Sequence, residues 1–224
     1  MISFDVDQTL LDFQRVLDEA LREVERFFIG HGINTNAAQL QSIRNDIELK
    51  HRTGKVDLLE IRRMSFVEIA GGDQLLAGKA LSLFKDVRFG AAYLFDDTIP
   101  VLEHLKKRFR IGWLTNGNST PKAAGIAHLF DYVVYSHDHG FQKPDARIFA
   151  AMANKAGGIA ASAFVHVGDS LETDVAGANN YGAKSVWLNR GGKLNNSAIQ
   201  PNWEVRNLFD LCDILDVSGP NNPK

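Results

Sequence analysis

The sequence contains a single cysteine, Cys212, among its 224 residues. One cysteine excludes an intramolecular disulfide framework and a cysteine-rich zinc module. It lies in the largely apolar run 211–215, so we expect it to be packed in the core. Long apolar runs are also missing, and no secretory leader precedes the first predicted strand. We therefore expect a soluble, cytoplasmic protein with no membrane partner.

The chain also lacks a charge bias, because 25 Lys and Arg stand against 27 Asp and Glu, a net charge of -2. Mixed charges of this kind give no broad attraction for a nucleic-acid polymer or a membrane surface. A local positive pocket for a small anion remains compatible with this balance. No internal repeat is present, and the tail 218–224, rich in Asn, Pro and Gly, is expected to be disordered. The sequence leaves the oligomeric state unknown.

Between residues 14 and 92 the sequence has helical periodicity and no strand signal. Apolar residues from Val16 to Phe28 recur on one helix face, and glycines follow them. Three further helices are expected, separated by glycines, with Asp57 opening the third. We therefore predict a helical domain of four helices over residues 14–92.

From Tyr93 onward, short apolar strands alternate with helices. This alternation is typical of a parallel sheet with helical crossovers. We predict an α/β fold, a Rossmann-like doubly wound core of residues 1–13 and 93–217 with the helical domain inserted after its first strand. The expected strands are 2–4, 110–114, 132–135, 163–167, 184–188 and 203–205, and the expected helices are 100–107, 122–129, 145–156, 171–181 and 208–215.

The first predicted strand runs directly into Asp5 and Asp7, two carboxylates one residue apart. Close carboxylates do not both remain ionised unless a cation lies between them. Mg²⁺ prefers oxygen ligands and tolerates substrate phosphates in its coordination shell. A magnesium site is therefore predicted here, although an acidic turn capping the strand is the alternative for an isolated Asp-X-Asp.

Further polar residues follow other predicted strands, where an open parallel sheet binds its ligands. Taken singly, each has a structural explanation. Thr115 or Asn116 would be a helix cap, and Lys143 an exposed lysine in a turn. Asp169 would be an N-cap, and Asp174 a first-turn acid favoured by the helix dipole. Taken together, they predict one site at the carboxyl edge of the sheet.

Four segments in this order resemble the motifs of the haloacid dehalogenase-like hydrolase superfamily, in its phosphatase branch. They are Asp5-Val6-Asp7-Gln8-Thr9-Leu10, Leu114-Thr115-Asn116-Gly117, Lys143-Pro144 and Gly168-Asp169-Ser170-Leu171-Glu172-Thr173-Asp174. The resemblance covers the whole chain, and the helical domain resembles the family's cap of the first type. Gln8 departs from the more usual Gly, Asp or Asn, at a position that carries no catalytic side chain.

The resemblance implies roles for these side chains. Asp5 would be the nucleophile that forms an aspartyl-phosphate, and Asp7 the general acid and base. Thr115 and the Asn116 backbone would hold phosphoryl oxygens, while Lys143 would neutralise charge on Asp5 and the phosphoryl group.

The resemblance also implies a Mg²⁺ cofactor. Asp5, the backbone carbonyl of Asp7 and Asp169 would hold the ion. Asp174 would complete the metal site through water or through contacts with the ligands.

Other activities occur on the same scaffold. A haloacid dehalogenase needs only the first aspartate and no metal, so the presence of Asp7, Asp169 and Asp174 disfavours it. A phosphonate hydrolase needs a cap lysine that forms a Schiff base. For a phosphomutase, the sequence of the cap contains no motif that would distinguish it from a phosphatase. A catalytically silent binding or regulatory member has no need of a general acid. The candidate Schiff-base lysines are Lys50, Lys55 and Lys79.

The predicted substrate is a small phosphorylated metabolite, either a nucleoside monophosphate or a sugar or acid phosphate. The basic stretch 50–55, with Arg62 and Arg63 nearby, resembles the cap turn of nucleotidase-like and sugar-phosphate phosphatase members. We expect His51 or Arg52 to bind the leaving group, and a solvated basic face is the alternative.

Two histidine segments remain outside this scheme. His137 and His139 share a short loop segment but no further ligand is fixed near them, so a solvated loop is predicted rather than a second metal site. His166, in a predicted buried strand, is expected to be a core histidine with satisfied hydrogen bonds, close to Asp169.

Overall fold

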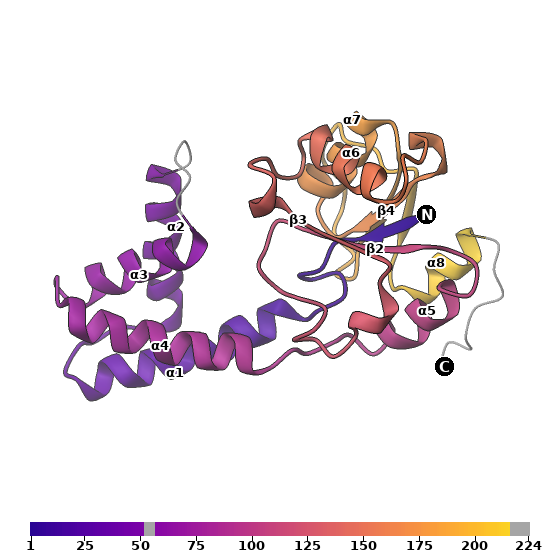
Figure 1. The fold of residues 1–224 in the computed structure, drawn as a ribbon. Coiled ribbons are helices and arrows are strands. Elements are labelled where there is room, and N and C mark those ends of the chain that lie inside the picture. Colours follow the sequence, from indigo (N-terminus) through magenta and orange to yellow (C-terminus); the bar gives the residue numbers. More distant parts are fainter. Residues whose placement is uncertain (52–56, 216–224) are drawn as a thin grey trace. The chain divides into compact units, whose positions relative to one another are not determined.

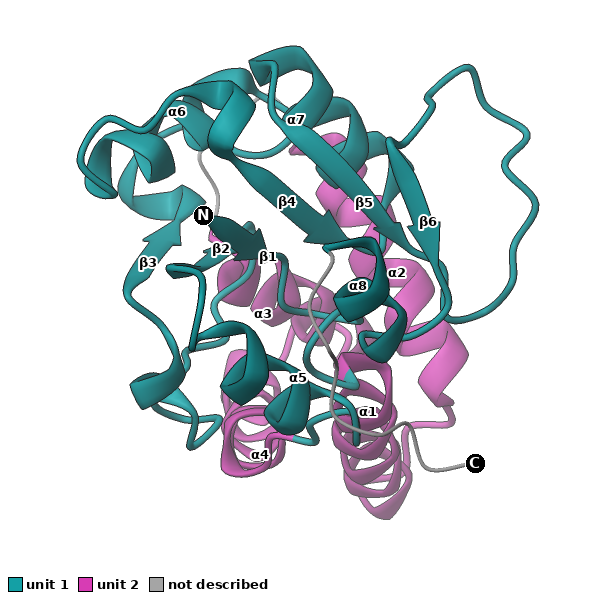
Figure 2. Cartoon of the chain, turned by 90° about the vertical axis from the view of Figure 1, so that its right-hand side faces the viewer, with its two compact units in different colours: residues 1–12, 93–224 teal, residues 13–92 magenta. Residues whose placement is uncertain are grey.

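The computed structural model describes residues 1–51 and 57–215. The chain divides into two compact units, one of residues 1–12 and 93–224 and the other of residues 13–92 (Figure 2). Within the described ranges, no helix combines the length and apolar character needed to cross a membrane. The predicted disordered tail 218–224 lies outside the described residues.

The unit of residues 13–92 consists, in its described part, of four helices around an apolar core. Phe28, Phe66 and Phe84 pack edge to face within this core, with ring centroids about 6 Å apart. Asp57 begins the third helix as predicted, because its carboxylate accepts a hydrogen bond from the Leu59 amide at 2.6 Å. The helices are α1 (Phe13–Gly30), α2 (Ala37–Lys50), α3 (Leu58–Ile69) and α4 (Gln74–Gly90).

The other unit is built on a six-stranded sheet in the order β3-β2-β1-β4-β5-β6. Every strand pair is parallel, which confirms the predicted α/β class. The first strand, although only three residues long, lies in the centre of the sheet. The strands are β1 (Ile2–Phe4), β2 (Ile111–Thr115), β3 (Tyr132–Tyr135), β4 (Val165–Gly168), β5 (Lys184–Leu188) and β6 (Trp203–Val205).

Helices cover both faces of this sheet (Figure 1). On one face, α5 (Thr98–Leu105) and α8 (Phe209–Ile214) pack against apolar side chains of β1 and β2, and the buried thiol of Cys212 belongs to this core as predicted. On the other face, α6 (Ala146–Lys155) and α7 (Ala176–Tyr181) pack on the side chains that point the opposite way.

Two of the predicted helices differ from the structure. Residues 122–129 form turns and a short 3₁₀ segment, η1 (Ala127–Leu129), because Gly125 has a positive φ of 73° that ends helical winding. The predicted helix 171–181 begins with a π-helical turn, η4 (Leu171–Val175), before α7. This turn carries Asp174 and shapes the loop after β4.

Candidate active site

The topology of the sheet brings three loops together. β1 pairs with β2 on one side and with β4 on the other, so the connections leave it in opposite directions. In open α/β sheets a crevice forms at such a point, beyond the carboxyl ends of the strands. The loops after β1 and β4 carry Asp5 and Asp169, and Thr115 is the last residue of β2.

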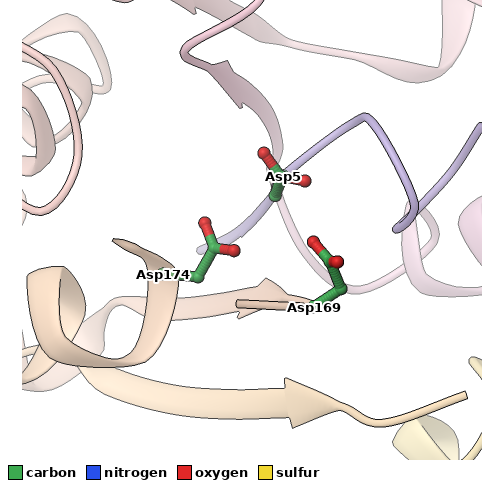
Figure 3. Close-up of side chains that lie close together, drawn as sticks. All are labelled: Asp5, Asp169 and Asp174. Atoms are coloured by element: carbon green, nitrogen blue, oxygen red, sulfur yellow. The ribbon is translucent and has the colours of Figure 1, made fainter. Parts of the chain in front are cut away.

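Three carboxylates meet beyond the ends of β1 and β4 (Figure 3). One oxygen from each of Asp5, Asp169 and Asp174 lies within 4.8 Å of the others. Asp5 and Asp174 are buried, and Asp169 is partly buried. The first and fourth motifs therefore lie close together in this unit, as predicted.

Lys143 lies between two of these carboxylates and is only 2 % exposed, so it is not an ordinary turn lysine. Its Nζ donates to Asp5 Oδ1 at 2.5 Å and to Asp174 Oδ1 at 2.6 Å. A third bond, to the Leu114 carbonyl at 3.2 Å, uses its last proton. The ammonium group is thus fixed in position and direction.

The environment shifts the pKa values of the three carboxyl groups in different directions. Burial raises the pKa of Asp5 to about 8 despite the opposing charge of Lys143, and burial with the charge of Asp174 raises the pKa of Asp169 to about 6. Burial opposes ionisation of Asp174 too, but Lys143 and His166 lower its pKa. Against the effect of burial, the charges of Asp174 and Asp5 raise the pKa of Lys143. The ion pair of Lys143 with Asp174 therefore persists at neutral pH.

This balance fits a divalent cation. When all three carboxylates are ionised, the single ammonium group leaves two negative charges uncompensated. Against the effect of burial, Lys143 and His166 lower the pKa of Asp174, whereas Asp5 and Asp169 carry the raised pKa values that a metal ion would reverse. Buried carboxylate oxygens are the ligands that Mg²⁺ prefers.

Asp7 is not a member of the carboxylate cluster. Its Oδ1 accepts a hydrogen bond from the Ser119 hydroxyl at 2.9 Å, so its side chain is engaged with the loop after β2. The other two carboxylates of the cluster, Asp169 and Asp174, come from the segment after β4. Within the first motif, directly after Asp7, Gln8 adopts a positive φ of 66°.

Thr115 and Asn116 hold this loop in place and do not cap a helix. The Thr115 hydroxyl accepts from the Gly117 amide at 2.9 Å. The Asn116 side chain forms two bonds with the backbone of Lys143, accepting from its amide at 2.9 Å and donating to its carbonyl at 3.0 Å. Asn116 thus joins the second and third motifs.

Gly117 packs so closely against Asp7 that a side chain there would push the Asp7 carboxylate aside. A Cβ at this position would lie 2.7 Å from Asp7 Oδ2. Under the general-acid role that the resemblance implies for Asp7, we expect Gly117→Ala to displace Asp7 and lower kcat/KM by about 100-fold, the lower range for loss of a general acid. Steady-state kinetics and thermal unfolding of the same preparations measure both effects. Gly191→Ala, where the nearest atom is 4.0 Å away, is the control, and equal activity of the two variants would contradict the expectation.

Three residues of the site were not assigned a role from sequence. The Thr9 hydroxyl donates to Asp5 Oδ2 at 3.1 Å, Ser119 contacts Asp7, and His166 contacts Asp174 at 3.1 Å. The placement of Thr9 and Ser119 in loops that follow strands was the only available signal. His166 is buried with both ring nitrogens in contact with polar groups, as predicted, and its carboxylate partner is Asp174.

Of the two substrate-binding residues predicted in the helical unit, the described part of the chain includes only His51. His51 follows α2, and its Nδ1 lies 2.8 Å from the Ile47 carbonyl. It lines a cavity of about 420 Å³ together with Lys50 and Arg63. Arg52 and Lys55 lie outside the described residues. A contact of His51 or Arg52 with substrate stays a prediction.

The loop with His137 and His139 forms a short 3₁₀ segment, η2 (Ser136–Asp138). Both histidines are exposed, and neither belongs to a group of potential metal ligands among the described residues. This arrangement agrees with the predicted solvated loop.

Comparison with known proteins decides the family. A model of the haloacid dehalogenase-like hydrolase family matches residues 1–182, which contain all four motifs. The chain belongs to the haloacid dehalogenase-like hydrolase family. The recognition of this family from the motifs is therefore confirmed.

Two relatives match the chain over almost its full length. Glyceraldehyde 3-phosphate phosphatase of Methanopyrus kandleri is 29% identical, with 96% of each chain covered. Pyrimidine 5'-nucleotidase YjjG of Escherichia coli is 25% identical, again with 96% of each covered. Both relatives are named for the removal of a phosphoryl group.

Solved structures of the family agree in fold. A 2-haloacid dehalogenase from Pseudomonas syringae superposes with a TM-score of 0.79 at 28% identity, covering 96% of this chain and 97% of that one. The HAD-hydrolase YfnB of Bacillus subtilis, solved bound to magnesium, also gives a TM-score of 0.79, at 26% identity and 96% and 98% coverage. The haloacid dehalogenase-like hydrolase fold thus supports more than one reaction.

Proposed function

We propose that this hydrolase is a magnesium-dependent phosphomonoesterase that acts on a small phosphorylated metabolite. The observation that carries the proposal is the buried Lys143 ammonium held between Asp5 and Asp174, with Asp7 set apart on Ser119. A carboxylate paired with a fixed cation is a suitable phosphoryl acceptor. A second carboxylate outside the metal cluster is suited to proton transfer.

The first step transfers the phosphoryl group to the protein. A carboxylate oxygen of Asp5 attacks phosphorus, a new O–P bond forms, and the bond to the leaving oxygen breaks. Asp7 gives its proton to that oxygen, which leaves as an alcohol. The charge of the Lys143 ammonium and the Thr115 hydroxyl would stabilise the negative charge of the phosphoryl oxygens.

The second step restores the site. Asp7, now ionised, takes a proton from a water molecule that attacks phosphorus. The bond between phosphorus and Asp5 breaks, inorganic phosphate is released, and Asp5 regains its carboxylate. The exchange of one proton at Asp7 balances the two steps.

Asp5, Asp169 and the backbone carbonyl of Asp7 would hold Mg²⁺, with Asp174 keeping Lys143 in place. When bound, the ion would neutralise the excess carboxylate charge and the charge of the phosphoryl oxygens. The three-carboxylate cluster supports this assignment.

Mg²⁺ is expected to stabilise the fold more at pH 8 than at pH 5.5. The raised pKa values of Asp5, about 8, and Asp169, about 6, mean that the metal-free fold retains protons that the unfolded chain, with ordinary values near 3.8, releases. Metal-free stability therefore falls as pH rises from about 4 through these values, and Mg²⁺ removes that penalty. At 100 times its Kd, the ion should add about 2.7 kcal/mol to the free energy of unfolding.

Thermal unfolding in Mg²⁺ and in EDTA at both pH values measures this effect. Asp169→Asn, which removes one of the proposed ligands, should abolish most of the Mg²⁺-dependent shift. An equal shift in this variant, or a larger shift at the lower pH, would contradict the proposed site.

The leaving group is proposed from the relatives and from the helical unit. The named relatives act on a triose phosphate and on pyrimidine nucleotides, which supports a sugar phosphate or a nucleoside monophosphate as substrate. We propose His51 and Arg52 as contacts of the leaving group. Unchanged KM values of Arg52→Ala across a panel of substrates would remove Arg52 from this role.

Dehalogenation is the second candidate, favoured by the likeness to the Pseudomonas syringae enzyme. In that reaction an ester forms between Asp5 and a carbon atom, halide leaves, and no general acid is required. Asp7 and the metal-ligand set favour the phosphatase. Release of halide from a 2-haloacid would support the alternative.

A screen of phosphorylated metabolites and p-nitrophenyl phosphate, with and without Mg²⁺, tests the proposed function. We expect Mg²⁺-dependent phosphate release from at least one sugar phosphate or nucleotide, and none above background with Asp5→Asn. Activity equal in wild type and Asp5→Asn, or none from either protein, would favour a silent binding member.

A further inference from the structure

Asp174 occupies a closely fitted position against the backbone of β4. A Cβ on Gly168 would lie 2.2 Å from Asp174 Cγ, so only glycine allows the carboxylate to reach this place. Asp174 is 1% exposed. A buried carboxylate in this position depends on protein donors for both its charge and its orientation.

Three donors hold this carboxylate. The Ser170 amide donates to Oδ2 at 3.1 Å, while Lys143 Nζ at 2.6 Å and His166 Nε2 at 3.1 Å both approach Oδ1. Lys143 is shared with Asp5, so it responds to events at the phosphoryl acceptor. Ser170 and His166 are therefore the donors that anchor Asp174 independently of Asp5.

The His166 ring is itself fixed on its other side. Ser3 and His166 are direct neighbours in the pairing of β1 and β4, and Ser3 Oγ lies 2.7 Å from His166 Nδ1. The Phe149 ring packs edge-on against the imidazole, with centroids 5.0 Å apart. An ionised Asp174 only accepts hydrogen bonds, so Nε2 carries the proton, and Nδ1 of the neutral ring accepts from the Ser3 hydroxyl.

We propose that His166 is a positioning residue of this enzyme, which orients Asp174 so that the Lys143 ammonium stays against the Asp5 carboxylate. A chain of contacts runs from Ser3 through His166, Asp174 and Lys143 to Asp5. His166 is linked to the groups that would touch substrate only indirectly, through Asp174. The kinetic tests of this inference rest on the proposed function.

Three variants separate positioning from packing. His166→Leu removes the donor, His166→Gln keeps an N–H that reaches toward Asp174, and Phe149→Leu weakens the packing around the ring without touching the hydrogen bonds. We expect His166→Leu to lower kcat/KM by about 10- to 100-fold, the usual effect of losing a residue that orients a catalytic ligand. His166→Gln should recover most of this loss.

A double-mutant cycle with Asp174→Asn adds a second criterion. If His166 acts through Asp174, His166→Leu should change kcat/KM by less than about threefold in the Asp174→Asn background. Independent losses that multiply would overturn the proposal. So would equal losses in His166→Leu and Phe149→Leu, or no recovery in His166→Gln.

A spectroscopic readout makes the inference independent of turnover. The Lys143 ammonium is buried and hydrogen-bonded, so its ¹H–¹⁵N signal should be observable in wild type and at a similar position in His166→Gln and Phe149→Leu. We expect this signal to shift or disappear in His166→Leu. An unchanged signal would refute the role of His166, whereas an inactive wild type with the expected spectral change would count only against the phosphatase proposal.

Discussion

Turnover of phosphate esters is expected to fall by at least about 10⁴-fold when Asp5 is replaced by asparagine. The amide is a poor nucleophile toward phosphorus, and the covalent route is closed without the carboxylate. The geometry should survive, because the asparagine oxygen can still accept from Lys143 Nζ, which lies 2.5 Å from Asp5 Oδ1. Steady-state kinetics on p-nitrophenyl phosphate, together with thermal unfolding, measures the loss at constant fold.

Asp96→Asn is the matched control, since Asp96 is exposed and the same charge is removed outside the cluster. It should retain wild-type activity within about twofold, as expected for a surface change. Asp5→Asn with more than about one-hundredth of wild-type activity would contradict the assignment of Asp5 as phosphoryl acceptor.

The largest effect on stability is expected from Lys143→Met. Removal of the ammonium leaves two buried carboxylates without their cation, and breaking one side of a buried ion pair costs about 3–5 kcal/mol. Activity should fall by about 10³-fold, because a fixed positive charge at the phosphoryl group is lost. Chemical denaturation in EDTA measures the first effect, and kinetics in Mg²⁺ the second.

The pH dependence of this variant has a defined sign. Without Lys143 the pKa values of Asp5 and Asp174 rise, while those of the unfolded chain stay at ordinary values near 3.8. The destabilisation should therefore increase as pH rises from about 4 toward 8, and disappear only as pH falls through the lowered pKa of Asp174. Lys155→Met, which removes an exposed lysine that donates to the Val133 carbonyl, is the control. A destabilisation independent of pH would contradict the proposed charge balance.

Much of the fold follows from patterns that the sequence makes visible. Alternating apolar strands and helices after Tyr93 predicted the parallel sheet, and Asp57 marked the start of α3. The helix predicted over residues 122–129 was wrong. The apolar spacing of this segment suits a helix, but Gly125 adopts a left-handed backbone conformation. The spacing of apolar residues does not reveal that a single glycine within the segment has a positive φ.

The site was predictable as a set of strand-end residues and less so as a set of contacts. The sequence placed Asp5, Lys143 and Asp169 at one edge of the sheet, where the structure has them. It did not indicate that Asp7 contacts Ser119, since these residues are 112 positions apart and meet only through the pairing of β1 and β2. The link from His166 to Asp174 likewise depends on the π-helical turn η4.

The chemical fate of Asp5 during turnover tests the account most directly. Enzyme mixed with an identified substrate is quenched within one turnover, reduced with borohydride and digested, and the peptide containing residue 5 is analysed by mass spectrometry. An acyl phosphate on Asp5 should appear as homoserine at that position. A parallel turnover in H₂¹⁸O should place the label in phosphate, because water attacks phosphorus. Reduction at another residue, or ¹⁸O in the Asp5 carboxylate as an alkyl ester would give, would contradict the account.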